Sequence, residues 1–224
     1  MLAGRVLVDG SVVTNPRSLV AVDASIRVRP ARELRGEAKL RHAIETLPVP
    51  VAGRVGLDVG AAAGGFTTAL LAAGARRVYA VDAGHGQLVG RLRQDPRVVD
   101  LEGTNLAALD PALVPDTVQV VTLDLSYLSL ARAVPQLEAV ALADDADLLG
   151  LVKPQFELGR SQAPRDAASL DEALAAAAAA VGAGPWRVLG LLRSPVRGAG
   201  GAVEGFLHAR RRLAPRDLGG SVQG

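Results

Sequence analysis

The sequence predicts an α/β fold in which a mainly parallel sheet carries helices on both faces. Short apolar runs alternate with longer helical stretches from residue 54 onward, and this alternation is typical of βαβ units. A glycine-rich loop follows the first of these runs, as expected where a strand turns into a helix beside a ligand. The chain of 224 residues is 49% apolar and 21% charged, so it has enough apolar side chains for the core of an ordinary domain.

Residues 1–29 are predicted to consist of short strands and turns. Strands are expected at 6–8 and 12–13 around Asp9-Gly10, a pair that favours a two-residue hairpin turn. Further breaks come at Asn15-Pro16 and Asp23-Ala24, and the segment is too short to bury a core of its own. A linker at 30–50 is expected to hold a helix over about 33–47, because prolines precede and follow that stretch.

Strands and helices are then expected to alternate over 51–213. Strands are predicted at 54–59, 77–81, 98–102, 118–123, 148–152, 186–192 and 205–212, and helices at 65–73 and 128–142. Ser169 and Glu172 are expected to form a capping box in front of an alanine-rich helix that ends at Gly182. The polar, glycine-rich tail at 214–224 is expected to fray.

Composition excludes several kinds of site. The chain has no cysteine, which excludes disulfides, thiolate zinc sites and a cysteine nucleophile. Aromatic residues make up 3% of the chain, which argues against broad stacking platforms for nucleic acid. No apolar run approaches the roughly 20 residues of a membrane span, and no signal-peptide pattern opens the chain. We therefore expect a cytoplasmic protein that does not enter a membrane; the sequence gives no indication of an oligomeric state.

Basic and acidic residues are segregated along the chain. Six basic residues lie between Arg27 and Arg41, whereas nine acidic residues and one basic residue lie between Asp100 and Asp147. This asymmetry favours one face that meets a polyanion such as nucleic acid, although two solvated faces explain it equally well.

Lysine is rare in this sequence. All but two of the 25 basic residues are arginine, and the exceptions are Lys39 and Lys153. A coding background that replaces lysine by arginine wherever either serves would keep lysine where the chemistry needs an amine. Only an ammonium readily gives up its proton, so both lysines are candidates for a reactive site.

Residues at the strand ends are further candidates, because ligands of parallel sheets bind beyond the carboxyl ends of the strands. The loop after the first strand contains Gly60, Gly64 and Gly65, which permit close backbone approach to a ligand. Asp82 ends the second strand of the alternating region, where a carboxylate can accept hydrogen bonds from a ribose diol. The glycine spacing differs from G-x-G-x-x-G, which disfavours a nicotinamide or flavin site.

A charged pair is predicted at two neighbouring strand ends. Asp124 ends the fourth strand of this region, and Lys153 ends the fifth. Neighbouring strands lie about 5 Å apart, so the two side chains are expected to meet over one pocket.

Several motifs resemble a known family. Residues 123–130 (Leu-Asp-Leu-Ser-Tyr-Leu-Ser-Leu), residues 151–159 (Leu-Val-Lys-Pro-Gln-Phe-Glu-Leu-Gly), the stretch 194–206 and the glycine-rich loop carry the resemblance. They are similar to the TlyA group of FtsJ-like, S-adenosylmethionine-dependent methyltransferases. This group acts on ribose 2'-hydroxyls of ribosomal RNA and was historically called hemolysins. The similarity extends over nearly the whole chain.

The resemblance implies a Rossmann-like methyltransferase with a seven-stranded sheet, S-adenosylmethionine as cofactor, and methyl transfer to a ribosomal RNA cytidine. No metal is expected. The family's catalytic Lys-Asp-Lys-Glu pattern falls on Lys39, Asp124, Lys153 and Glu204. The cofactor candidates are Asp58, Gly60, Gly64, Gly65, Asp82 and Asn105. Lys153 is assigned as the group nearest the 2'-oxygen, either as a neutral base or as a charged group that orients the hydroxyl.

The first segment resembles the end of an S4 RNA-binding domain, in residues 3–13 and Asp23. The helices that open such a domain are absent from this sequence, which we interpret as an upstream start of translation or as a shortened protein. Residues 1–29 are thus a partial S4-like segment, 30–50 the linker helix with the first catalytic lysine, and 51–213 the methyltransferase domain. The implied partner is ribosomal RNA or a ribosomal subunit.

Two other function classes are compatible with the sequence. A dinucleotide-dependent oxidoreductase could use the same fold, but it would give no role to Lys39 or Glu204. A non-catalytic RNA-binding or ribosome-associated protein with a retained cofactor pocket would bind the cofactor without methylating RNA.

Overall fold

The structure is a computed structural model that describes residues 6–29 and 33–212. It contains two compact units, the first reaching to Glu33 and the second beginning at Leu34. The predicted tail at 214–224 and the first residues of the S4-like segment lie outside the described ranges.

The first unit is a three-stranded antiparallel sheet in the order β2-β1-β3. Its strands are β1 (Val6–Val8), β2 (Ser11–Val12) and β3 (Ile26–Val28). Asp9 and Gly10 have φ angles of 49° and 84°, as in the type I′ turn of a tight hairpin, which confirms the predicted turn. Strand β3 was not predicted, because its three residues follow a long irregular stretch.

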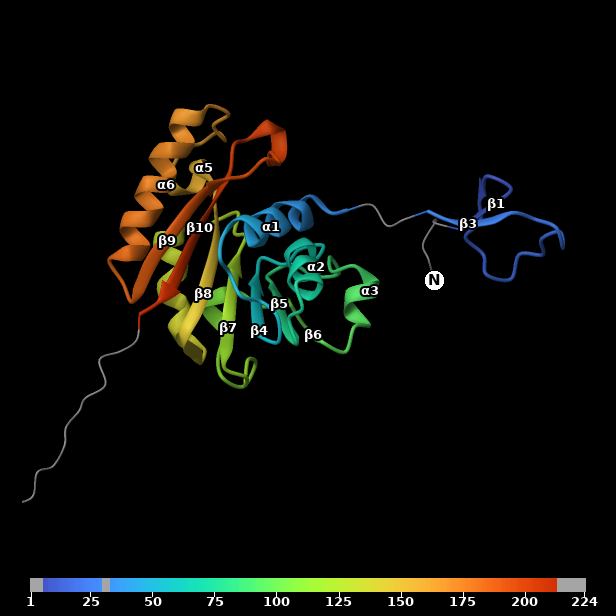
Figure 1. Cartoon of the computed structure of the whole chain (residues 1–224), viewed down its shortest axis with the longest axis horizontal. Coiled ribbons are helices and arrows are strands. Elements are labelled where there is room, and N and C mark those ends of the chain that lie inside the picture. The colour runs from blue at the N-terminus through green and yellow to red at the C-terminus, as the bar shows by residue number, and fades with distance from the viewer. Residues whose placement is uncertain (1–5, 30–32, 213–224) are drawn as a thin grey trace, which may run out of the picture. The chain divides into compact units, whose positions relative to one another are not determined.

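The second unit is built on a seven-stranded sheet (Figure 1). Its strands are β4 (Val55–Val59), β5 (Arg77–Asp82), β6 (Val98–Glu102), β7 (Val118–Leu123), β8 (Leu142–Val152), β9 (Trp186–Arg193) and β10 (Gly205–Arg211). They lie in the order β6-β5-β4-β7-β8-β10-β9, and only β10 runs antiparallel to its two neighbours. The predicted mainly parallel, seven-stranded sheet is confirmed.

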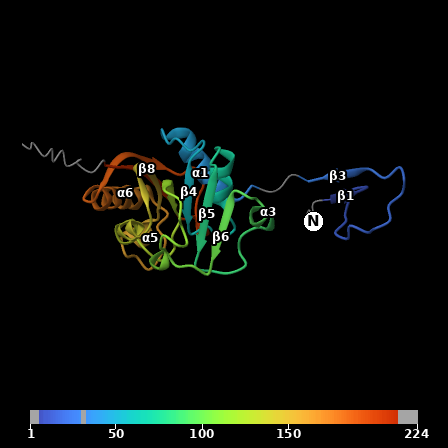
Figure 2. The same ribbon diagram turned by 90° about the horizontal axis from the view of Figure 1, so that it is seen from below.

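Two apolar layers cover the two faces of this sheet, because successive side chains of a strand point to opposite faces. One layer joins α1 (Arg35–Thr46) and α2 (Gly65–Ala72) to one face, through Leu40 and Leu70 among others. The opposite layer contains α6 (Ala167–Gly182) with α4 (Leu130–Ala133) and the 3-10 helix η2 (Val134–Ala139). The view in Figure 2 shows α1 and α6 on opposite sides of the sheet.

Short helices complete the unit at the loops. They are α3 (Gly90–Arg93), α5 (Pro154–Glu157) and the 3-10 helices η1 (Leu106–Ala108) and η3 (Ala199–Gly201). No helix among the described residues is long and apolar enough to cross a membrane.

The helix predicted at 128–142 is wrong in its second half. The α-helix ends at Ala133, the chain continues as a 3-10 helix with Pro135 in its first turn, and β8 already begins at Leu142. The strand was expected only from residue 148, whereas β8 also includes acidic residues in its first half. Asp145 and Asp147 are accommodated there because both pair with Arg54, each at 2.9 Å.

The predicted capping box is also wrong. Asp166 is the N-cap of α6, and its side chain accepts a hydrogen bond from the Ser169 backbone N–H at 2.8 Å. Ser169 therefore lies within the first turn. Glu172 pairs with Arg160 at 2.8 Å instead of returning to the helix start.

Candidate functional site

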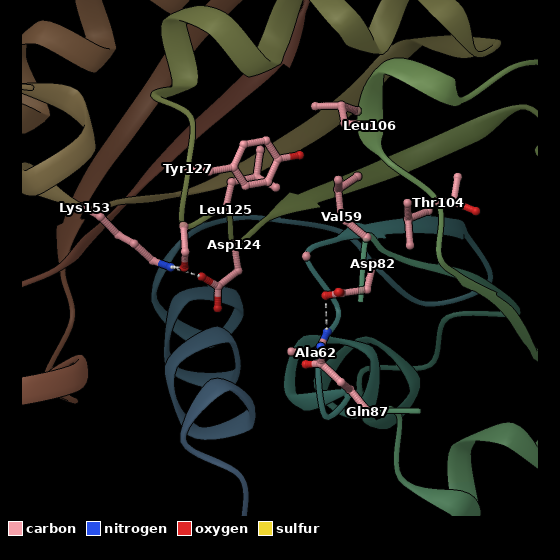
Figure 3. Close-up of a pocket in the computed structure, with 14 residues that line it drawn as sticks. Val59, Ala62, Asp82, Gln87, Thr104, Leu106, Asp124, Leu125, Tyr127 and Lys153 are labelled. Atoms are coloured by element: carbon pink, nitrogen blue, oxygen red, sulfur yellow. Dashed lines mark hydrogen bonds and ion pairs between the residues drawn. The ribbon is translucent and has the colours of Figure 1, made fainter. Parts of the chain in front are cut away.

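A cavity of about 340 Å³ opens at the carboxyl ends of β4, β5 and β7. The chain leaves β4 toward β5 and β6 on one side and reaches β7 and β8 on the other, so the strand order reverses between β4 and β7. Open α/β sheets bind ligands at this kind of position. The residues that line the cavity are Val59, Gly60, Ala62, Val81, Asp82, Ala83, Gln87, Thr104, Leu106, Asp124, Leu125, Ser126, Tyr127 and Lys153 (Figure 3).

The loop after β4 forms one side of the cavity and depends on Gly60. This residue has a φ of 87°, which favours glycine, and a methyl group on it would collide with the carbonyl oxygen of Asp124. The Gly60 and Ala61 N–H groups both donate to the Val81 carbonyl, at 2.8 and 3.0 Å. Glycine at this position lets the ends of β4 and β7 approach each other closely.

Asp82 holds two loops beside the cavity. Its carboxylate oxygens accept hydrogen bonds from the Ala62 N–H at 2.8 Å and from the Gly84 N–H at 2.7 Å. Figure 3 shows Asp82 and Ala62 together on the side of the cavity opposite Lys153. Each carboxylate oxygen can accept a further hydrogen bond, so the side chain can also bind a ligand.

Asp58 is placed differently from the other cofactor candidates. It is fully buried and accepts hydrogen bonds from Thr67 at 2.6 Å and from Thr122 at 2.9 Å. Burial raises the pKa of Asp58 to about 6, and the two hydroxyl groups partly counteract this rise. The side chain lies outside the cavity lining and connects β4, α2 and β7.

The remaining cofactor candidates also lie outside the lining of this cavity. Gly64 is the N-cap of α2, and Gly65 begins that helix. Asn105 accepts a hydrogen bond from the Ala107 N–H at 3.2 Å and caps η1, and its oxygen also accepts one from the Tyr127 hydroxyl at 3.4 Å. These three residues therefore shape the loops around the cavity.

Lys153 and Asp124 meet at the cavity edge as the sequence predicts. The Nζ atom of Lys153 lies 2.6 Å from Asp124 Oδ1 and donates a hydrogen bond to Ser126 Oγ at 2.9 Å. The side chains of Lys153 and Asp124 are 16% and 25% exposed, so the pair is accessible from the cavity. Figure 3 shows their charged ends directed toward each other.

Lys39 and Glu204 form a second ion pair, which is more deeply buried. Lys39 Nζ, on α1, lies 2.5 Å from Glu204 Oε2, just before β10, and these side chains are 9% and 7% exposed. The four catalytic candidates are thus two ion pairs.

A second cavity of about 230 Å³ connects the two pairs. Glu204 and Lys153 both line it, and it shares Lys153 and Ser126 with the first cavity. Lys39 does not line this cavity, but it forms an ion pair with Glu204, which does. Lys153 therefore lies between two cavities.

A third cavity, of about 270 Å³, lies beside the start of α1 and α2. It is lined by residues 34–36, 60–63, 65 and 66 together with Asp124. Gly60, Ala62 and Asp124 also belong to the first cavity, so the two spaces share one wall.

Four polar residues that line the first cavity were not among the predicted site residues. Ser126 and Tyr127 follow Asp124 closely, and their place just beyond a strand end was the signal that could have found them. Gln87 and Thr104 lie in loops without a distinctive pattern. Among the described residues, no group of three or more histidine or acidic side chains could hold a metal ion.

Comparisons with known proteins agree with this geometry. The model of a family described as FtsJ-like methyltransferase matches residues 33–182. The 16S/23S rRNA (cytidine-2'-O)-methyltransferase TlyA of Mycobacterium tuberculosis is 42% identical over 236 residues, covering 98% of this chain and 87% of that protein. Hemolysin A of Brachyspira hyodysenteriae is 32% identical over 217 residues, covering 93% of this chain and 90% of that protein.

A solved structure of a hemolysin candidate from Streptococcus thermophilus is also similar. It has a TM-score of 0.75 and 32% identity, covering 96% of this chain and 81% of that one.

Proposed function

The chain belongs to the FtsJ-like methyltransferase family, and on that premise we propose that it transfers a methyl group from S-adenosylmethionine to the ribose 2'-hydroxyl of a cytidine in ribosomal RNA. The observation that carries the proposal is the place of Lys153. Its Nζ is held by Asp124 and Ser126 and faces two cavities, one suited to each reactant. A transfer reaction needs the two reactants on either side of the group that aligns them.

The first cavity is proposed to hold S-adenosylmethionine. Gly60 lines it at a position where any side chain would collide with the Asp124 backbone, and Asp82 offers a carboxylate for the ribose hydroxyls. Gln87 and Thr104 supply further hydrogen-bonding groups in the same lining. When bound, the cofactor supplies the methyl group of its sulfonium, and the remainder of the cofactor departs as a neutral thioether.

Lys153 is proposed to contact the 2'-oxygen of the acceptor. Two partners, Asp124 and Ser126, leave one position on Nζ for the substrate: an N–H when the amine is charged, or the lone pair when it is neutral. A charged Lys153 would orient the hydroxyl, whereas a neutral Lys153 would accept its proton as the oxygen–carbon bond forms and the carbon–sulfur bond breaks. Asp124 fixes the amine in either case.

Lys39 and Glu204 are proposed to complete the site from the second cavity. Their ion pair joins α1 to the loop before β10, and Glu204 forms part of the cavity wall beside Lys153. In this position the pair can hold the acceptor ribose against Lys153.

The first unit is proposed to add affinity for RNA. Arg17, Arg27 and Arg29 lie in or beside its three-stranded sheet, and all three are exposed. The division into an S4-like segment at 1–29, a linker helix at 30–50 and a methyltransferase domain at 51–213 is part of this proposal. A ribosomal RNA substrate would place the enzyme in the cytoplasm.

The proposal is tested by mapping 2'-O-methyl groups on ribosomal RNA from cells with and without the gene. We expect one or a few cytidines to lose the modification, and purified enzyme with labelled S-adenosylmethionine to restore it. An unchanged map, together with no methyl transfer by the purified enzyme, would contradict the proposal. Binding of a nicotinamide dinucleotide in place of S-adenosylmethionine in calorimetry would favour an oxidoreductase.

A further inference from the structure

We propose that Gln155 selects the acceptor base in the second cavity and favours cytosine over uracil. This inference rests on the proposed function, because it concerns the RNA that the enzyme methylates. The second cavity begins at Lys153 and extends away from the first cavity, so a nucleotide whose 2'-oxygen contacts Lys153 can place its base there. An enzyme gains access to a target nucleotide by taking its base out of the stack and into such a pocket.

The size and walls of the second cavity suit a single aromatic ring. Its volume of about 230 Å³ lies below the roughly 300 Å³ at which sites for drug-sized ligands begin. Pro154, Phe156, Pro164 and Val203 provide apolar surface in its lining. A flat base would lose water against these apolar side chains, which makes unpaired polar atoms at its edge costly.

Gln155 is the polar group available to the edge of the base. Three other polar residues line the cavity, but Lys153 and Ser126 bind each other and Glu204 pairs with Lys39. Those three residues lie at the ribose end in the proposed reaction. Gln155 carries both an amide oxygen and an amide N–H that can pair with a base.

One hydrogen bond to the backbone orients the Gln155 amide. Its Nε2 donates a hydrogen bond to the backbone carbonyl of Ser161 at 3.4 Å. Turning the amide over would place Oε1 against that carbonyl oxygen, and two acceptors repel each other. This contact therefore favours one order of Oε1 and the second N–H at the cavity.

A fixed order distinguishes the two pyrimidines of RNA. Cytosine has an amine donor at position 4 beside an acceptor at N3, whereas uracil has an acceptor at position 4 beside a donor at N3. With Oε1 accepting from the cytosine amine and the N–H donating to N3, uracil would meet acceptor with acceptor and donor with donor. A well-matched pair of this kind discriminates by about 5- to 150-fold.

The experiment compares two RNAs that differ only in having cytidine or uridine at the methylated position. We expect the wild-type enzyme to prefer cytidine in kcat/KM, and Gln155→Ala to lose most of this preference because its activity on cytidine falls. Gln155→Glu offers only acceptors, and we expect it to reduce the preference as well. Gln136→Ala is the matched control, since Gln136 is also half-buried and donates to a backbone carbonyl, that of Arg132 at 2.9 Å, but lies outside the cavity.

Calorimetry with S-adenosylmethionine checks that each variant keeps its fold, because Gln155 does not line the first cavity. Equal wild-type activity on both RNAs would overturn the inference alone. An unchanged preference in Gln155→Ala and Gln155→Glu would do the same. No methyl transfer to either RNA by the wild-type enzyme would overturn the proposed function, and this inference with it.

Discussion

Lys39 Nζ lies 2.5 Å from Glu204 Oε2, although the two residues are 165 positions apart in the sequence. Both side chains are more than nine-tenths buried, so neither charge is well solvated without the other. The pair attaches α1 to the loop before β10, at the wall of the second cavity. A structural contribution therefore coincides with the proposed catalytic one at these residues.

Removing one member of this pair is expected to destabilise the protein strongly. Lys39→Met or Glu204→Leu leaves a buried charge without its partner, which costs about 3–5 kcal/mol in the free energy of unfolding. The double variant removes both charges and should recover most of that loss. Urea denaturation of the four proteins measures the coupling, and single-variant losses below about 1 kcal/mol would contradict the expectation. We expect the double variant to remain inactive in methyl transfer even where its stability returns.

Lys153→Ala is expected to abolish methyl transfer while it changes the affinity for S-adenosylmethionine only a few-fold. Lys153→Arg keeps the charge and the ion pair with Asp124 but offers a guanidinium that does not give up its proton. An active arginine variant would mean that Lys153 orients the hydroxyl, and an inactive one with normal cofactor affinity would favour proton transfer. Turnover of the alanine variant at the wild-type rate would remove Lys153 from the mechanism.

Gly60→Ala is expected to lower the affinity for S-adenosylmethionine by more than about tenfold, because the added methyl group collides with the Asp124 carbonyl at the cavity. Gly53→Ala is the matched control. Gly53 also has a positive φ, of 73°, but a methyl group there meets no atom within 4 Å. The control should cost only about 1–2 kcal/mol in stability and leave cofactor affinity unchanged. Calorimetry with both variants checks this, and equal affinities would argue against Gly60 as part of the cofactor site.

Asp58 is expected to make stability depend on pH. Because burial raises its pKa from 3.8 to about 6, the folded state binds more protons than the unfolded state between these values. Stability therefore falls as pH rises through this window. Relative to Asp58→Asn, the wild-type protein should lose roughly 2 kcal/mol between pH 4 and pH 7. Urea titrations of both proteins across this range test the sign of the effect. A wild-type free energy of unfolding that rises with pH relative to that of Asp58→Asn would refute it.

Glu102→Gln is expected to weaken cofactor binding more than turnover at saturating S-adenosylmethionine. The Glu102 carboxylate accepts hydrogen bonds from the N–H groups of Gly86, Gln87 and Leu88 at 2.6 to 2.9 Å, and so holds the loop that carries Gln87 to the cavity. An amide offers fewer acceptor sites to these donors. Steady-state kinetics should show a raised KM for the cofactor, whereas Glu138→Gln, an exposed control, should leave it unchanged.

The backbone N–H donors lower the pKa of Glu102 from 4.5 to about 2, and the Leu88 N–H has the largest effect. Its contribution to stability is thus complete above pH 4.5 and is lost as pH falls toward 2. A wild-type KM for the cofactor that rises between pH 7 and pH 5 would contradict the lowered pKa of Glu102.

Much of the fold was predictable because its signals are local. Apolar runs marked the strands of the parallel sheet, and Asp9-Gly10 specified a turn that only residues tolerant of positive φ adopt readily. The failures came where a distant partner outweighed the local pattern. The predicted helix and strand left residues 143–147 unassigned, but pairing with Arg54 allows Asp145 and Asp147 to lie in β8.

The sequence by itself determined the sheet and the strand ends that carry Asp82, Asp124 and Lys153. The rarity of lysine in it also identified Lys39 as a candidate. The pattern along a strand follows from backbone geometry, which nearby residues specify. Only the tertiary structure decided that Lys39 pairs with Glu204, that Lys153 lies between two cavities, and that Asp58 is buried outside the lining of the first cavity. Contacts between residues far apart in the chain depend on how the layers pack, and no local pattern records that packing.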